Sequence, residues 1–129
     1  MTPEQYLEKA LHAVSAAKLL LAGNELDGAC NRAYYAMFNA AHAALLWSGA
    51  RTNPGETKKH SSLIAAFGKH LVLAGIFPHE LGKSLNKAES IRLLADYTGE
   101  DIGLQQANSI VKEAESFVSA VTEKYKPVI

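Results

Sequence analysis

The sequence contains a single cysteine, Cys30, among its 129 residues. An intrachain disulfide is therefore excluded, and this suits a reducing compartment, so we expect a cytoplasmic protein. Lysine plus arginine and aspartate plus glutamate both number 13, which gives a formal net charge of zero. No global positive field exists to attract nucleic acid, and a nucleic-acid ligand would need a local cluster of basic side chains.

Signatures of secretion, membrane insertion and metal binding are also missing. The N-terminal stretch "MTPEQYLEKA" lacks the basic-then-apolar plan of a signal peptide. The longest nearly uncharged stretch, residues 33–50, is dominated by alanine and contains Asn39, His42 and Ser48, so it predicts a buried helix rather than a membrane span. No HExxH, cysteine-rich or paired-histidine pattern and no glycine-rich phosphate loop is present. We therefore predict neither a metal site nor a cofactor.

The sequence does contain helical periodicity along most of its length, and no stretch alternates with period two for long enough to be a strand. We expect a first helix that begins at Thr2. Four further helices are expected at about Asn24 to Trp47, about Thr57 to Leu73, Pro78 to Tyr97, and about Ile102 to Tyr125. The pattern predicts one all-α domain over residues 1–129, an up-and-down four-helix bundle with a short additional helix.

Local signals predict how these helices begin and end. Thr2 and Gln5 form a capping box around Pro3 at the first helical position. Gly23 is expected to end the first helix in the left-handed conformation, and Asn24 to cap the second. The second helix carries seven alanines, which let neighbouring helices approach closely, so it should be the central helix of the fold.

Four polar residues of this second helix are separated by three, four and three positions and therefore share one face: Arg32, Tyr35, Asn39 and His42. They could form a polar pocket, or a hydrogen-bonded seam against another helix. Tyr34 and Phe38 lie beside this stripe, and we expect them to be core or interface aromatics.

The only dense positive cluster is "KKHSS", in which Lys58, Lys59 and His60 stand at the start of the third helix. A helix start with adjacent serines would suit a phosphate or another anion. The alternative is a solvated helix start.

The segment "IRLLADY" ends the fourth helical pattern and places Arg92 at the rim of its core face. Asp96 follows four residues later, so a helical ion pair is expected. An arginine in this position can hold a phosphate through two hydrogen bonds, or it can anchor the helix end.

Three segments together, "NRAYYAMFNAAHAALL", "KKHSSLIAAFGKHLV" and "PHELGKSLNKAESIRLLADY", resemble the HEPN domain, and more narrowly its small single-domain bacterial and archaeal members. The resemblance implies an up-and-down four-helix core with a short extra helix, usually dimeric. It also implies a minimal nucleotidyltransferase as partner in a toxin–antitoxin pair. Active members are metal-independent ribonucleases with an Arg-x4-6-His motif. The arginine stabilises the phosphate, and the histidine acts as base or acid toward the ribose 2′-hydroxyl.

By this resemblance Arg92 matches the motif arginine, but no histidine follows at the required spacing. Positions 97 to 99 are Tyr97, Thr98 and Gly99. An unperturbed phenol has a pKa near 10, against roughly 6.5 for imidazole, so tyrosine is a poor base at neutral pH. The arginine half of the motif is thus present and the proton-transfer half is missing. His60 or His42 could replace the histidine in space.

We therefore predict a homodimer that binds a nucleotide or RNA phosphate, works with a nucleotidyltransferase and has no membrane segment. The candidate binding residues are Arg92, Arg32, Tyr35, His60 and Asp96. One alternative is a ribonuclease with a degenerate Arg-x4-Tyr motif, in which Arg92 and Tyr97 are the catalytic positions. Another is a helical dimer whose polar residues are only structural. In some toxins of the family the partner adds AMP to a tyrosine just after the motif histidine, and Tyr97 lies near that register.

Overall fold

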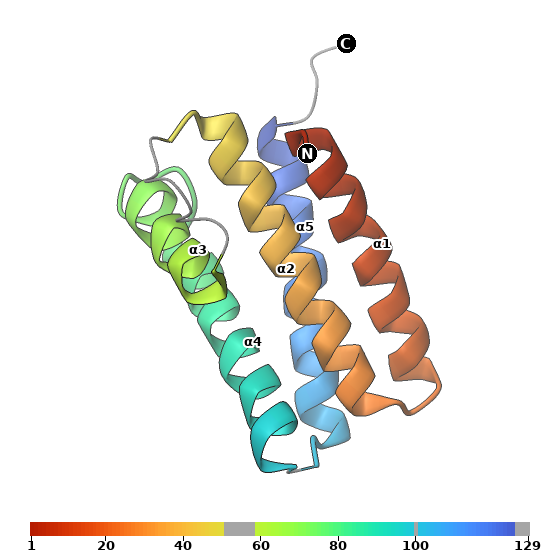
Figure 1. Cartoon of the computed structure of the whole chain (residues 1–129). Coiled ribbons are helices and arrows are strands. Elements are labelled where there is room, and N and C mark those ends of the chain that lie inside the picture. The colour runs from red at the N-terminus through yellow and green to blue at the C-terminus, as the bar shows by residue number, and fades with distance from the viewer. Residues whose placement is uncertain (51–58, 100, 126–129) are drawn as a thin grey trace.

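The computed structural model describes residues 1–50, 59–99 and 101–125, and these contain helices and no strand. The elements are α1 (Pro3–Ala22), α2 (Leu26–Ser48), α3 (His60–Phe67), a π-helical turn η1 (Gly68–Val72), α4 (His79–Thr98) and α5 (Leu104–Tyr125). The long helices α1, α2, α4 and α5 run alternately up and down, and the short α3 lies on the path from α2 to α4 (Figure 1). The predicted all-α bundle with a short additional helix is confirmed.

Helix α2 occupies the centre of the bundle, as the alanine content predicts. It contacts α1, α3, η1, α4 and α5. All seven alanines are fully buried: Ala29, Ala33, Ala36, Ala40, Ala41, Ala43 and Ala44. Because alanine has only a methyl side chain, α2 can be surrounded on several sides without large voids. Larger side chains from the neighbouring helices fill the remaining space, including Phe67 and Phe117, whose ring centres lie 5.3 Å apart.

The predicted capping box at the start of α1 is present. The Thr2 hydroxyl accepts a hydrogen bond from the Gln5 backbone N–H at 3.1 Å, and the Gln5 side chain accepts one from the Thr2 N–H at 2.8 Å. These two bonds satisfy N–H groups that a helix start otherwise leaves without partners.

The predicted roles of Gly23 and Asn24 between α1 and α2 are wrong. Gly23 keeps a negative φ of −85°, and Asn24 takes the left-handed conformation with φ 61°. The Glu25 N–H bonds to the Leu20 carbonyl at 2.8 Å, and the Asn24 N–H bonds to the Leu21 carbonyl at 3.1 Å. This is the pattern of a Schellman motif with asparagine in the left-handed position, which its short polar side chain tolerates. Helix α2 begins after it without a side-chain cap.

The third helix differs from the predicted continuous segment. Thr57 and Lys58 lie outside the described residues, and the helix begins at His60. From Gly68 onward the chain forms a π-helical turn, in which the Leu73 N–H bonds to the Gly68 carbonyl at 2.9 Å. A residue is thereby inserted into the helical ladder, so periodicity read as a single α-helix could not predict it. Within the described residues, no helix is both long and apolar enough to cross a bilayer.

Candidate functional site

Tyr34 of α2 lies at the centre of the candidate site and is fully buried. Its hydroxyl shares a hydrogen bond of 2.9 Å with Nδ1 of His60, the first residue of α3. The guanidinium carbon of Arg92, on α4, lies 4.7 Å from the centre of the Tyr34 ring. At this distance a cation is attracted to the face of the ring. A cation and an imidazole that are far apart in the sequence therefore contact the same buried phenol.

Two carboxylates flank Arg92 along α4. Asp96 Oδ2 lies 3.2 Å from Nη1, so the predicted helical ion pair is present, and Glu89 Oε2 lies 3.7 Å from Nη2. Exposure differs between the two partners: the side chain of Glu89 is 17% exposed and that of Asp96 is 49% exposed. Sequence reasoning missed Glu89, although an acidic residue three positions before an arginine on a helix is a readable signal.

We refer to Tyr34, His60, Glu89, Arg92 and Asp96 as the Tyr34 cluster. Within the described part of the chain, Nε of Arg92 and Oε2 of Glu89 are buried without a hydrogen-bond partner. An arginine carries five N–H donors in a fixed plane. The guanidinium therefore has hydrogen-bonding capacity that its present neighbours leave unused.

The environment of the Tyr34 cluster favours the neutral forms of the Tyr34 phenol and the His60 imidazole, because it shifts the pKa of each. Burial, reinforced by an interaction with the Glu89 carboxylate, raises the pKa of the Tyr34 hydroxyl, and Arg92 only partly opposes this. Burial and then the Arg92 charge lower the pKa of His60, against a smaller opposite effect of Glu89. His60 is accordingly a neutral imidazole at neutral pH, with one donor and one acceptor nitrogen.

Aromatic side chains of α2 surround the His60 ring. The ring centre of Phe38 lies 4.5 Å from that of His60, and the Tyr35 ring meets it edge-on at 5.7 Å. Tyr34 is a core residue, as expected, whereas Phe38 and Tyr35 are only partly buried. These two rings therefore form a wall with one side against His60.

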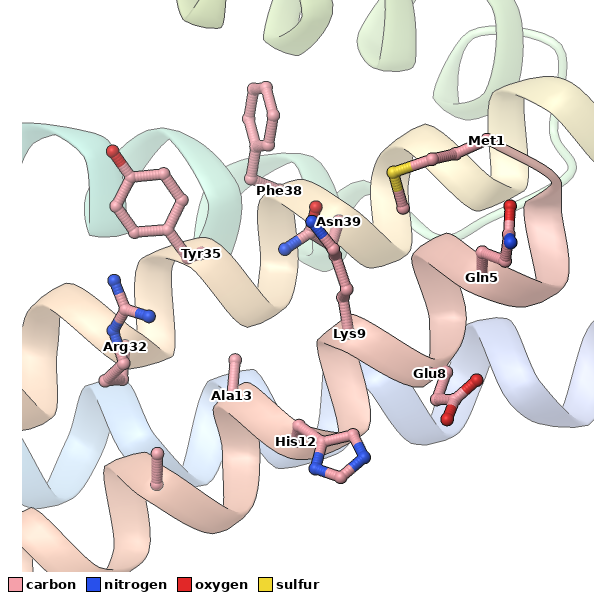
Figure 2. A pocket seen from close by; sticks show the side chains of 11 residues that line it. Met1, Gln5, Glu8, Lys9, His12, Ala13, Arg32, Tyr35, Phe38 and Asn39 are labelled. Atoms are coloured by element: carbon pink, nitrogen blue, oxygen red, sulfur yellow. The ribbon is translucent and has the colours of Figure 1, made fainter.

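The same two rings also line a groove of about 1050 Å³ between α1 and α2 (Figure 2). We call this the α1–α2 groove. Its lining residues are Met1, Gln5, Glu8, Lys9, His12, Ala13, Ala16, Arg32, Tyr35, Phe38 and Asn39. Arg32 lies over the Tyr35 ring, with 5.2 Å between the guanidinium carbon and the ring centre. Three members of the predicted polar stripe thus border an open groove.

The remaining candidates belong neither to the Tyr34 cluster nor to the lining of the α1–α2 groove. His42, the fourth residue of the stripe, stacks on Tyr6 with ring centres 3.9 Å apart, and burial lowers its pKa. Tyr97 is 82% exposed in the last turn of α4. Lys59 is exposed, and its neighbour Lys58 lies outside the described residues. Among the residues that the structure describes, no three His, Cys, Asp or Glu side chains are grouped to hold a metal ion.

Comparison with known proteins identifies the family. The HEPN domain profile matches residues 3–125. The chain is 37% identical to "UPF0332 protein glr0978" of Gloeobacter violaceus, over 90% of each chain. It is 36% identical to "Putative toxin MJ0605" of Methanocaldococcus jannaschii, over 95% of this chain and 88% of that one. A UPF0332 protein of Thermotoga maritima is 35% identical over 92% of this chain and 86% of its own length. A match of this extent, on an all-α bundle of the expected topology, shows that the chain belongs to the HEPN domain family.

Proposed function

We propose that this HEPN protein binds a nucleotide or RNA phosphate at the Tyr34 cluster. The observation that carries the proposal is the meeting of Arg92 and His60 on the buried Tyr34 ring. The tertiary structure thereby assembles an arginine and a neutral histidine, although no histidine follows Arg92 along α4. Arginine binds phosphate through paired hydrogen bonds, and a neutral imidazole can bind a ribose hydroxyl.

The exposure of the two carboxylates indicates how a phosphate would enter. Asp96 is half exposed, so it is the partner of Arg92 that a phosphate can displace. Glu89 is mostly buried, and together with the Tyr34 ring it would keep the guanidinium plane in place during this exchange. Preorganisation of this kind reduces the entropy lost on binding.

The proposal also includes partners. Two matching Methanocaldococcus jannaschii proteins have "Putative toxin" in their names. A toxin requires a neutralising partner, and in this family we expect a minimal nucleotidyltransferase. We further propose that the protein is a homodimer. Co-expression with a neighbouring nucleotidyltransferase gene, followed by affinity purification and light scattering, tests both statements.

Ligand binding is tested by thermal shift and fluorescence anisotropy with AMP, ATP and a short RNA. Binding to the native state must raise the melting temperature. Arg92→Gln should remove the shift, whereas Lys69→Gln, which loses the same charge at an exposed position outside the cluster, should retain it. Arg92→Lys keeps the charge but not the paired geometry, and should bind weakly. If no ligand raises the melting temperature of the wild-type protein, the cluster has a structural role only.

A second candidate function is metal-independent RNA cleavage with His60 as the base, and the neutral state of His60 favours it. With the Tyr34 hydroxyl turned toward Glu89, its oxygen accepts the Nδ1–H of His60 and leaves Nε2 free. Nε2 then takes the proton of a ribose 2′-hydroxyl, and the 2′-oxygen attacks phosphorus. The bond to the 5′-oxygen breaks, and that oxygen takes a proton from water. The products are a 2′,3′-cyclic phosphate and a 5′-hydroxyl.

Cleavage assays in EDTA separate this candidate from binding alone. His60→Gln should abolish cleavage and retain much of the RNA affinity, because glutamine still offers hydrogen bonds but cannot accept the proton. Tyr97→Phe should leave cleavage unchanged, since Tyr97 is 82% exposed in the last turn of α4. Cleavage that is lost in Tyr97→Phe and retained in His60→Gln would favour the Arg-x4-Tyr alternative.

The exposure of Tyr97 also makes its hydroxyl accessible to a modifying partner. We propose it as an acceptor of AMP. Mass spectrometry of the Tyr97 peptide after co-expression with a neighbouring nucleotidyltransferase tests this, with Tyr97→Phe as the control. An unmodified peptide contradicts the assignment.

A further inference from the structure

We propose that the α1–α2 groove is a track for single-stranded RNA that leads to the Tyr34 cluster. The inference rests on the proposed function, to which it adds a second contact surface on different residues. Its support comes from the size, charge and aromatic lining of the groove and from its continuity with the cluster.

The groove is large enough for several nucleotides. Its volume of about 1050 Å³ is at the upper end of the range for small-molecule pockets, roughly 300–1000 Å³. Along α1 the lining extends from Gln5 to Ala16. At ~1.5 Å per helical residue this distance is about 16 Å, which matches roughly four or five stacked nucleotides at ~3.4 Å each.

Charge in the groove is complementary to a phosphate chain. Lys9 and Arg32 provide two permanent cations from opposite walls, and both are exposed. Figure 2 shows Lys9 extending from α1 toward the side chains of α2, whereas Glu8 points away from them. Glu8 is the one carboxylate among the described lining residues. Because the whole chain has a formal net charge of zero, this local excess of cations is a property of the groove.

The aromatic lining favours unpaired bases. Tyr35 and Phe38 are partly exposed in the groove, and Arg32 lies over the Tyr35 ring. Bases of a single strand stack on such rings, while the flanking cations bind the backbone. A duplex hides its base faces within the stack, so the groove should prefer single-stranded RNA.

Continuity with the Tyr34 cluster gives the track its direction. The Phe38 and Tyr35 rings, which line the groove, also contact the ring of His60. RNA lying over these two rings would therefore pass beside His60 on its way to Arg92. The groove would hold the chain, and the cluster would hold one particular phosphate.

The test uses fluorescence anisotropy of the full chain with a labelled single-stranded RNA of about ten nucleotides. The variant is Lys9→Glu/Arg32→Glu, and the matched control is Lys69→Glu/Lys112→Glu, which makes the same change in charge at two exposed positions outside the groove. We expect at least ~10-fold weaker RNA binding in the groove variant. The slope of the logarithm of the binding constant against the logarithm of the salt concentration should become shallower by about 1.4, which is ~0.7 for each of two lost phosphate contacts. The control should bind as the wild type does. The same RNA in a duplex, and inorganic polyphosphate, should compete weakly.

Any of the following results would overturn the track. The groove and control variants could lose affinity equally, or the groove variant could lose none. Polyphosphate could compete as well as RNA, which would leave the aromatic wall without a role. Light scattering could show that the groove variant changes from dimer to monomer, which would make the groove a subunit interface. The proposed function is judged separately, since Arg92→Lys should weaken RNA binding whether or not the groove variant does. A wild-type protein that binds AMP but no RNA removes the track and leaves the phosphate site.

Discussion

The Tyr34 cluster and the α1–α2 groove share helix α2 but hold their polar groups in opposite environments. In the cluster, Tyr34 is fully buried and Arg92 is 15% exposed between two carboxylates. In the groove, Arg32 and Lys9 are exposed to solvent. Burial strengthens each polar contact and makes an unpaired group costly, whereas exposure leaves a charge available to a ligand at little structural cost. The cluster should therefore dominate stability, and the groove should affect only binding.

The largest effect is expected from Tyr34→Ala. Removal of a fully buried aromatic ring leaves a cavity and typically costs about 3–5 kcal/mol. His60 and Arg92 also lose their common contact. The free energy of unfolding from urea titrations should fall by about that amount. A loss below about 1 kcal/mol would show that the cluster is not a centre of stability.

Arg92→Ala should lower the free energy of unfolding by a smaller amount, about 1–3 kcal/mol. The reason is that Glu89 is then left as a mostly buried carboxylate without its cation. Adding Glu89→Gln to Arg92→Ala should recover part of the loss, since the uncompensated charge is removed. Urea titrations of the two single variants and the double variant measure this coupling. Strict additivity would contradict the pairing.

Acidification should destabilise the protein through two partly buried histidines, His60 and His42. The pKa of His60 and that of His42 are lowered by burial, so the unfolded chain takes up protons first as the pH falls below roughly 6.5. The stabilisation is complete above that value and is lost as the pH falls through the folded-state pKa values. Urea midpoints at about pH 7.5 and about pH 5 measure the effect. Replacing both histidines with glutamine should flatten the difference, and an unchanged pH dependence would contradict the assignment.

The smallest effect on stability is expected in the groove. Lys9→Glu/Arg32→Glu should change the free energy of unfolding by no more than about 0.5 kcal/mol per position, because both side chains are exposed. The same variant should strongly weaken RNA binding. A large loss of stability would instead place these side chains in a structural interface.

Features that depend on neighbouring residues were predictable from the sequence. The capping box of Thr2 and Gln5 and the pair of Arg92 and Asp96 both form within one helical turn. The central position of α2 was also predictable, because its many alanines let neighbouring helices approach closely. Such interactions need only helical geometry, which the sequence spacing already contains.

Features that depend on which of several possible contacts forms were not predictable from the sequence. Gly23 and Asn24 can each end a helix in the left-handed conformation, and backbone hydrogen bonds across the turn selected Asn24. His60 was expected at a helix start that could face an anion or solvent, but its ring turned inward to Tyr34. That orientation depends on how α3 packs against α2, which no local pattern contains.

The sequence by itself determined that this protein is a helical bundle with α2 at its centre, and the comparison of sequences determined its membership of the HEPN family. Only the tertiary structure decided that His60 and Arg92 meet on Tyr34, and that Arg32, Lys9 and Phe38 border one groove. The physical reason is the distance along the chain over which each kind of interaction acts. Helix formation and capping act over about one turn, whereas a site is made by packing between helices that are distant in the chain.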